Sequence, residues 1–271
     1  MKTDRSTPNA AHDHTTATFL QMAVREAGTR VLELAQNGFD ISIKPDSSQV
    51  TTADYEVDRI LQERLLSRYP EDGWLSEETP DDRKRLDKDR VWILDPIDGT
   101  RNFISKIPQY AISIALVENQ EPVLAVIYNP ATNEMFSAEK HAGAYLNDMP
   151  IHVNAAHNER LTCLANISAH TKAELNSIAP NIDYTGFGSI AYALALQAIG
   201  RVDITLNPGS QNEWDIAAGV LLVQEAGGTA KDRNWQPIPF NQPNPATQGV
   251  IATRPDKTDT VQQLLESLRT P

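Results

Sequence analysis

The sequence has one cysteine and no long apolar run, and both absences limit what the protein can be. The single cysteine, Cys163, excludes an internal disulfide framework and is compatible with a reducing compartment. We expect its thiol to be buried and unreactive. No apolar stretch approaches the roughly 20 residues of a membrane span, and the first residues lack the apolar core of a secretion signal. We therefore expect a cytoplasmic protein with no membrane-inserted part.

Positive charge is also scarce. The chain has 24 Lys and Arg residues against 36 Asp and Glu residues, which gives a formal net charge of -12. A general surface for nucleic acid or anionic membranes is therefore not expected, although a local basic pocket is still allowed. An acidic balance favours metal binding, but only weakly.

The first residues are polar and aperiodic, and we expect residues 1–18 to form a flexible N-terminal tail. His12 and His14 lie in this tail, which explains them more simply than metal binding does. The length of 271 residues permits one large α/β domain or two coupled halves. We place the division near residue 155, between an N-terminal half at 19–155 and a C-terminal half at 156–271.

Hydrophobic periodicity predicts both helices and strands. Helical spacing occurs in FLQMAVREAGTRVLELAQNG, DYEVDRILQERLLSRYP, GSIAYALALQAIG, WDIAAGVLLVQEAGG and TDTVQQLLESL. The runs VWIL, AISIALV and VLAVIY are typical of strands, and AYLNDMPIHV has the turn chemistry of a hairpin. The helix in GSIAYALALQAIG is apolar on almost every side and must be buried. These elements predict an α/β protein in which sheets are covered by helices in layers.

The stretch WILDPIDGT places two carboxylates, Asp95 and Asp98, at the end of an apolar strand. Pro96 cannot donate to the next ladder position, so we expect the chain to leave the sheet after Asp95. Ligands of open α/β sheets bind at this end of a strand, and the amides of Gly99 and Thr100 can face an anion there. Two acids this close repel unless a cation lies between them, and a hard divalent ion fits best. An aspartate-rich turn explains the same residues equally well.

Four further acids stand near the ends of predicted elements. Asp54 lies in the first turn of a helix, Asp215 lies at a helix start, and Glu77 and Glu78 lie in the polar loop of GWLSEETPDD. Taken singly, each has a plain explanation. Acids at helix starts are favoured by the helix dipole, and the glutamates can be solvated surface residues.

Taken together, these stretches resemble the inositol monophosphatase superfamily of lithium-sensitive, magnesium-dependent phosphomonoesterases. This superfamily also includes bisphosphate nucleotidases and some fructose bisphosphatases. The matching elements are VTTAD, LSEE, DPIDGTRNF and EWDIAAG with the following EAGG, in the family's order and at similar spacing. The resemblance covers most of the chain and implies an αβαβα sandwich, the sugar-phosphatase fold. It also implies a homodimer.

The resemblance assigns the metal-binding oxygens to six positions. They are the carboxylates of Asp54, Glu77, Asp95, Asp98 and Asp215 and the carbonyl of Ile97. Hard oxygen ligands of this kind select magnesium, with manganese as an alternative, over zinc, and the family binds two or three such ions. Asp54 would contact the third, weaker ion or its waters, and Glu78 would support the site without binding metal.

Catalytic roles follow from the same resemblance. Glu77 and Thr100 would orient and deprotonate the attacking water, and Asp54 would hold Thr100 through a hydrogen bond. The amides of Gly99 and Thr100 would hold the phosphate. Asp215 would bind the metal nearest the leaving group.

Substrate contacts are assigned by resemblance to Asp98, Gly99, Thr100, Arg101, Ser189, Asn207 and Asp215. Asn207 stands at or beside the position where inositol-phosphate enzymes often carry an acid for ring hydroxyls. Arg101 is a candidate cation for a second phosphate, with Lys44 and Lys106 as weaker ones, and a surface ion pair explains Arg101 equally well. Ser189 is also explained as an ordinary helix cap.

Three neighbours of these positions have structural explanations. Tyr192 and Leu196 are expected in the core, and Trp214 is expected to pack so that it fixes the orientation of Asp215.

The expected function is hydrolysis of a small phosphorylated polyol of the inositol monophosphate type by metal-activated water. The alternatives are a 3'(2'),5'-bisphosphate nucleotidase, which converts adenosine 3',5'-bisphosphate to AMP, and a fructose-1,6-bisphosphatase. A regulatory binding protein that retains the fold is the rival of a different class. All the carboxylates that the chemistry needs are present, which argues against that rival.

Overall fold

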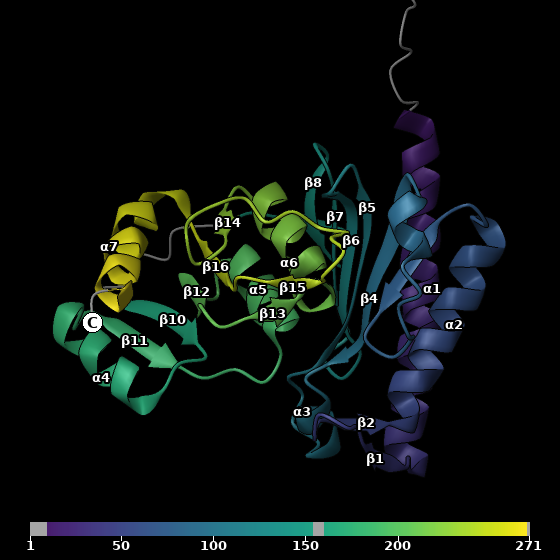
Figure 1. Cartoon of the computed structure of the whole chain (residues 1–271), viewed down its shortest axis with the longest axis horizontal. Helices are drawn as coiled ribbons and strands as arrows, with labels where there is room; N and C mark the ends of the chain where they lie inside the picture. Colours follow the sequence, from purple (N-terminus) through teal and green to yellow (C-terminus); the bar gives the residue numbers. More distant parts are fainter. Residues whose placement is uncertain (1–9, 154–159, 270–271) are drawn as a thin grey trace, which may run out of the picture.

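A computed structural model describes the backbone of residues 10–153 and 160–269 and the side chains of residues 16–153 and 160–267. Helices and sheets alternate in five layers, from the helix pair at one end to the helix pair at the other (Figure 1). The structure therefore has the layered α/β fold that the sequence predicts.

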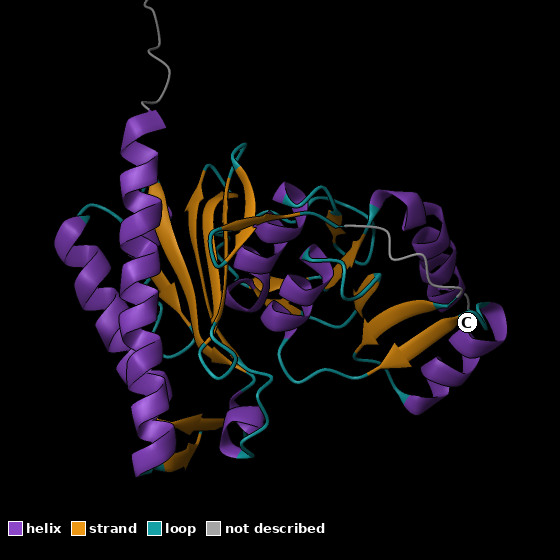
Figure 2. Cartoon of the chain, turned by 180° about the vertical axis from the view of Figure 1, so that it is seen from behind, coloured by secondary structure: helices purple, strands orange, loops and turns teal. Residues whose placement is uncertain are grey.

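The first layer consists of α1 (Ala10–Asn37) and α2 (Thr52–Arg68), which lie together on one face of the larger sheet (Figure 2). Helix α1 begins at Ala10, earlier than the expected start at Phe19, because no proline or glycine interrupts the chain between these residues. Residues 1–9 and the side chains of His12 and His14 lie outside the described residues.

The second layer is a seven-stranded sheet with the order β3-β4-β5-β6-β7-β8-β9. Its strands are β3 (Gly73–Ser76), β4 (Arg90–Asp98), β5 (Ala111–Glu118), β6 (Glu121–Asn129), β7 (Glu134–Glu139), β8 (Gly143–Leu146) and β9 (Met149–Ile151). Strands β3 and β4 are parallel, and the other neighbours are antiparallel. The β8–β9 hairpin turns at Asn147 and Asp148, both with positive φ, which confirms the expected turn.

Strand β4 alternates between two cores and continues past its proline. Trp92 and Leu94 pack toward α1 and α2, whereas Ile93 packs toward the central helices. The expectation that the chain leaves the sheet after Asp95 is wrong, because β4 runs to Asp98. The pairing with β5 shifts between Asp95 and Asp98, so Pro96 falls at an irregularity where no ladder donor is needed.

The third layer consists of α5 (Ile190–Ala198) and α6 (Glu213–Glu225). Their apolar residues form the central core, which the two sheets cover from either side. Helix α5 is buried along almost its whole length, as its composition requires.

The fourth layer is a five-stranded sheet with the order β11-β10-β12-β16-β14. Its strands are β10 (Leu161–Ala165), β11 (Ile182–Thr185), β12 (Ile204–Asn207), β14 (Thr229–Lys231) and β16 (Val250–Thr253). Helices α4 (Ala169–Ile178) and α7 (Thr258–Arg269) form the fifth layer and complete a third core. Cys163 lies in this core at 1 % exposure, and burial raises the pKa of its thiol, as expected of an unreactive cysteine.

Short elements complete the chain. A two-stranded hairpin of β1 (Ile41–Ile43) and β2 (Gln49–Thr51) lies near the short helix α3 (Thr100–Ile104), and a second strand pair joins β13 (Gln211–Asn212) to β15 (Ala246–Thr247). Two 3-10 turns cover Lys84–Asp87 and Pro255–Lys257. Within the described ranges, no helix combines the length and the apolar character that crossing a bilayer requires.

Candidate metal centre

Three carboxylates from three elements meet at one edge of the larger sheet. One oxygen each of Glu77, Asp95 and Asp215 lies within 4.8 Å of the other two. The strand register explains part of this convergence, because β3 and β4 are parallel and Ser76 lies opposite Leu94. Glu77 therefore follows β3 at the edge where Asp95 follows Leu94 in β4. The third acid, Asp215, comes from the first turn of α6.

Asp95 is the most confined of these acids. Its side chain is 2 % exposed, and its Oδ1 atom has no hydrogen-bond partner among the described residues. Burial, followed by the charges of Glu77, Asp98 and Asp215, raises the pKa of Asp95 well above its ordinary value. A buried carboxylate among other carboxylates is unfavourable unless a cation compensates the charge. The oxygen-only donor set and the unpartnered Oδ1 atom fit a hard divalent ion.

Two aspartates of the site are held by helix capping. The Oδ2 atom of Asp54 accepts hydrogen bonds from the backbone N–H of Thr51 at 2.8 Å and from its hydroxyl at 2.6 Å, at the start of α2. At the start of α6, the Oδ2 atom of Asp215 accepts from the backbone N–H of Asn212 at 2.8 Å. Both acids occupy the third position of a capping box, which fixes one oxygen and leaves the other directed elsewhere.

Burial also changes the acidity of these two aspartates. It raises the pKa of Asp54 to about 6, although the hydrogen bonds from Thr51 act in the opposite direction. Burial, and then the charge of Asp98, raises the pKa of Asp215 well above its ordinary value. The capping hydrogen bonds therefore do not compensate the removal of these carboxylates from water.

Asp98 is tied to the second half of the chain. Its Oδ2 atom accepts hydrogen bonds from the Ser189 hydroxyl and from the Ala191 backbone N–H, both at 2.6 Å, at the start of α5. Burial raises its pKa to about 7 against the effect of these two bonds. Asp98 lies outside the group of three oxygens described above, and the Ser189 hydroxyl is both a helix cap and a partner of Asp98.

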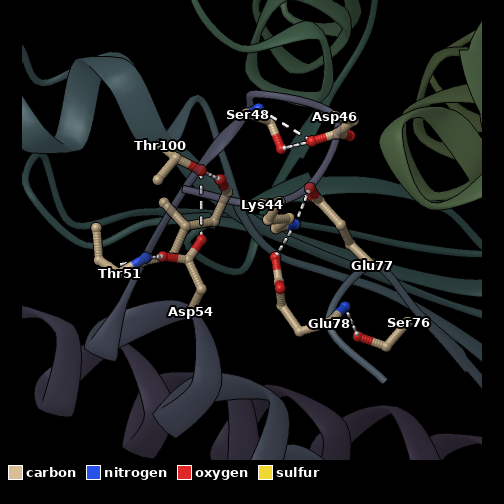
Figure 3. Close-up of polar contacts among 10 residues, drawn as sticks. Lys44, Asp46, Ser48, Thr51, Asp54, Ser76, Glu77, Glu78 and Thr100 are labelled. Carbon is tan, nitrogen blue, oxygen red and sulfur yellow. Dashed lines mark hydrogen bonds and ion pairs between the residues drawn. The ribbon is translucent and has the colours of Figure 1, made fainter. Parts of the chain in front are cut away.

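Thr100 links the carboxylate cluster to the turn of WILDPIDGT. Its hydroxyl lies 3.0 Å from the Ile97 carbonyl oxygen and 3.3 Å from Oδ1 of Asp54, so it can donate to either atom (Figure 3). Gly99 precedes it with a φ of 93°, and a Cβ atom there would lie 3.1 Å from the Gly188 carbonyl oxygen. A side chain at position 99 would thus be strained and crowded, which explains the glycine.

Lys44 lies between the two glutamates of the site, whereas the sequence suggested it only as a weak candidate for binding a second phosphate. The Nζ atom of Lys44 lies 2.7 Å from Oε1 of Glu77 and 2.6 Å from Oε1 of Glu78 (Figure 3). Partial burial opposes the charge of Lys44, but the hydrogen bonds and charges of the two glutamates outweigh it and raise its pKa. Burial raises the pKa of Glu78 to about 7.

Lys44 comes from the turn between β1 and β2. In this turn the Oδ1 atom of Asp46 accepts from the Ser48 backbone N–H at 2.9 Å and from its hydroxyl at 2.7 Å. Because Lys44 is paired with carboxylates, it is not available for a second phosphate in this arrangement. No motif surrounds it in the sequence, and only the three-dimensional placement of the hairpin brings it to the site.

The other two basic residues considered for binding a second phosphate lie on the surface. Arg101 is exposed on α3, and within the described part of the chain its guanidinium has no hydrogen-bond or ion-pair partner. Arg101 therefore forms no surface ion pair with any residue that the structure describes. Lys106 is exposed just after α3, with a φ of 58°.

Asn207 and the three residues that were expected to have structural roles lie in the third and fourth layers. Asn207 ends β12 and is 3 % exposed, and Trp214 is half-buried against the central core next to Asp215. Tyr192 is 7 % exposed and donates from its hydroxyl to Glu134 at 2.5 Å, which agrees with the expected core role. Leu196 is partly buried against the same core.

Comparisons with known proteins give a consistent result. The model of the inositol monophosphatase family matches residues 12–269. The chain is 33% identical to an inositol monophosphatase of Mesembryanthemum crystallinum over 231 residues, which cover 79% of this chain and 85% of the relative. It is also 33% identical to the Nus factor SuhB of Escherichia coli K12 over 221 residues, which cover 78% of this chain and 82% of that protein. Among solved structures, the extragenic suppressor protein suhB from Bartonella henselae superposes with a TM-score of 0.80 at 29% identity, covering 94% of this chain and 99% of the other.

Proposed function

Because this chain belongs to the inositol monophosphatase family, it is a phosphoric monoester hydrolase, and we propose that it hydrolyses a small phosphorylated polyol of the inositol monophosphate type with the help of magnesium. The observation that carries this proposal is that one oxygen each of Glu77, Asp95 and Asp215 lies within 4.8 Å of the other two, while the buried Oδ1 atom of Asp95 has no hydrogen-bond partner among the described residues. Carboxylates arranged in this way would hold divalent ions through oxygen atoms alone.

The residues that would hold the metal are Asp54, Glu77, Asp95, Asp98, Asp215 and the carbonyl of Ile97. When bound there, two or three magnesium ions, or manganese, would neutralise the phosphate oxygens, lower the pKa of a water and stabilise the departing oxygen. Electrostatic stabilisation would then dominate the rate enhancement.

The residues of the chain itself supply the remaining chemistry. Glu77 accepts a proton from the attacking water, and the Thr100 hydroxyl orients that water. The hydroxyl is itself positioned by its hydrogen bond to Oδ1 of Asp54. The backbone amides of Gly99 and Thr100, at the start of α3, hold the phosphate oxygens. No covalent intermediate is required.

The leaving alcohol would contact the opposite part of the site. Asp98 and Ser189 are joined by a 2.6 Å hydrogen bond at the start of α5, and Asn207 ends β12, a strand of the other sheet that contacts α5, so these residues would offer hydrogen-bonding groups to hydroxyls. An asparagine at position 207 can bind a hydroxyl without adding a charge, which supports a neutral polyol as the leaving group.

A second candidate function is hydrolysis of a 3'(2'),5'-bisphosphate nucleotide. The observation in its favour is the exposed guanidinium of Arg101 next to Thr100, which no other described residue engages. A second phosphate on the substrate would be a suitable partner for it. Fructose 1,6-bisphosphate meets the same requirement.

The test is a comparison of kcat/KM on myo-inositol 1-phosphate, adenosine 3',5'-bisphosphate and fructose 1,6-bisphosphate at saturating magnesium. We expect the inositol ester to be the best substrate, and no hydrolysis in EDTA. The Asp95→Asn variant should be inactive, whereas Asp183→Asn, an exposed aspartate that is paired with Arg160, should be as active as the wild type. If the wild type preferred a bisphosphate substrate and Arg101→Ala removed that preference, the result would favour the second candidate function.

Two properties are proposed on the family resemblance alone. We propose that the protein is a homodimer and that it acts in the cytoplasm. One relative is named a Nus factor, and a regulatory role for this chain would be supported if purified protein formed a stable complex with a large partner while hydrolysing none of the three esters.

A further inference from the structure

A cavity of about 310 Å³ reaches the metal centre from the side of Glu77. Its inner wall includes Glu77 and Trp214, the residue directly before Asp215. Its outer wall includes Arg83 and Asn244, both of which are exposed to solvent. The cavity thus extends from the carboxylate cluster to the surface. Ser189 borders a different cavity, of about 90 Å³, on the side assigned to the leaving alcohol.

The two walls of this cavity are fixed to each other. Arg85 is 2 % exposed and donates to the Asn241 side chain at 2.6 Å and to the Gln242 carbonyl oxygen at 2.9 Å. The backbone N–H groups of Asn241 and Gln242 donate in turn to the fully buried carboxylate of Glu213 at 2.6 and 2.8 Å. Glu213 begins α6, so the outer loop is anchored to the helix that carries Asp215. The opening is therefore part of the folded framework.

Arg83 gives the outer end of the cavity a positive charge. No residue in the described ranges forms a hydrogen bond or ion pair with its guanidinium. Asp81 also lines the cavity, but both of its carboxylate oxygens bind Arg85, at 3.1 and 2.9 Å, and it forms no ion pair with the Arg83 guanidinium. An exposed guanidinium at the mouth of a cavity attracts oxyanions.

We propose that this cavity is the route by which inorganic phosphate leaves the metal centre, with Arg83 as its anion-binding mouth. The proposal rests on the proposed phosphatase function. In the hydrolysis, the water oxygen bonds to phosphorus as the bond to the ester oxygen breaks, and the electron pair of that bond goes to the ester oxygen. Glu77 takes one proton of the attacking water, and the ester oxygen takes a proton from solvent water and departs as the alcohol.

The direction of this reaction explains why a separate exit is useful. In-line attack moves phosphorus toward the side of the incoming oxygen, which is the side of Glu77 and of this cavity. The alcohol lies on the opposite side, near Ser189 and Asn207. Phosphate can then leave past Glu77 and Trp214 without waiting for the alcohol to clear the other side.

The experiment measures phosphate exchange on the magnesium-loaded protein. ³¹P NMR line shapes give the dissociation rate of inorganic phosphate, and calorimetry gives its Kd. Asn244→Trp narrows the outer wall, Arg83→Gln removes the charge at the mouth, and Lys84→Gln removes a neighbouring surface charge that does not line the cavity. Melting temperatures with and without magnesium establish that each variant is folded.

Because a route is used in both directions, obstructing it slows the association and the dissociation of phosphate by the same factor and leaves the Kd of phosphate unchanged. We expect Asn244→Trp to slow phosphate dissociation at least about ten-fold with Kd within about two-fold, and Arg83→Gln to slow it about three- to five-fold. Lys84→Gln should have the wild-type rate. The proposal is wrong if Asn244→Trp and Arg83→Gln release phosphate at the wild-type rate, or if Lys84→Gln slows release as much as Arg83→Gln does. Failure of the wild-type protein to hydrolyse any phosphomonoester would instead overturn the proposed function.

Discussion

The substitution Asp95→Asn should stabilise the metal-free protein while it removes the stabilisation by magnesium. Asp95 is buried, its Oδ1 atom has no partner among the described residues, and two other carboxylates lie within 4.8 Å. Replacing this carboxylate with an amide removes one charge from the cluster and introduces N–H donors next to Glu77 and Asp215. The metal-free protein then loses repulsion, and the metal loses a ligand.

The size of the effect follows from the distances. At about 5 Å and an effective dielectric constant of about 20, two unit charges repel by roughly 3 kcal/mol. Partial protonation relieves some of this repulsion, because burial and the neighbouring acids raise the pKa of Asp95. We therefore expect a gain of about 1–3 kcal/mol in EDTA, or about 2–4 °C in Tm for each kcal/mol in a chain of this size.

The matched control is Asp203→Asn, at an aspartate that is buried to the same degree but paired. Asp203 is 3 % exposed and binds Arg254 at 2.7 Å, whereas Asp95 is 2 % exposed without such a cation. Breaking a buried ion pair costs about 3–5 kcal/mol, so this variant should melt at a lower temperature in EDTA.

The assay is thermal unfolding at pH 8 in EDTA and in magnesium. Magnesium at about a hundred times its Kd should stabilise the wild type by about 2.7 kcal/mol, should do the same for Asp203→Asn, and should barely affect Asp95→Asn. If Asp95→Asn lowered Tm in EDTA as much as Asp203→Asn does, the carboxylate cluster would not be repulsive, and the reasoning would be refuted.

Three further outcomes are expected. Lys44→Met should lower the magnesium concentration needed for half-maximal activity, because the ammonium group no longer competes for Glu77; an unchanged magnesium titration would contradict this. Thr100→Val should reduce kcat roughly 100-fold at an unchanged Tm, because the hydroxyl held by Asp54 is lost while the shape is kept, and steady-state kinetics with a melting curve check it. Cys163 should react with a thiol reagent only at the rate of unfolding, because it is 1 % exposed, and rapid modification of the native protein would argue against this core.

The positions of several carboxylates relative to helices and strands could be predicted from short local stretches, whereas their grouping into one metal site was implied only by the family resemblance of those stretches taken together. Asp54 and Asp215 occupy the third position of capping boxes, and Asp95 lies in β4 directly after the apolar run that ends at Leu94. Local patterns of this kind indicate helix starts and apolar strand segments without knowledge of the tertiary fold. The layered fold could be predicted for the same reason.

Features that depend on tertiary pairing could not be predicted. Pro96 was expected to end β4, but the pairing with β5 places it at an irregularity, and the strand continues to Asp98. Lys44 reaches Glu77 and Glu78 only because the β1–β2 hairpin is positioned over them, and no residue near Lys44 in the sequence indicates that position. A local rule fails where the partner strand or the partner charge is distant along the chain.

The hydrogen bonds at the helix starts fix the positions of several carboxylates of the candidate metal centre without any metal. Asp54, Asp98 and Asp215 are each held through Oδ2 at the start of a different helix, so the direction of the second oxygen is fixed by the backbone. Fixed oxygens cannot turn away from one another to relieve repulsion, as mobile side chains would. The repulsion is therefore retained in the metal-free protein, and under the proposed function a divalent ion would gain affinity by removing it without the entropic penalty of ordering its ligands.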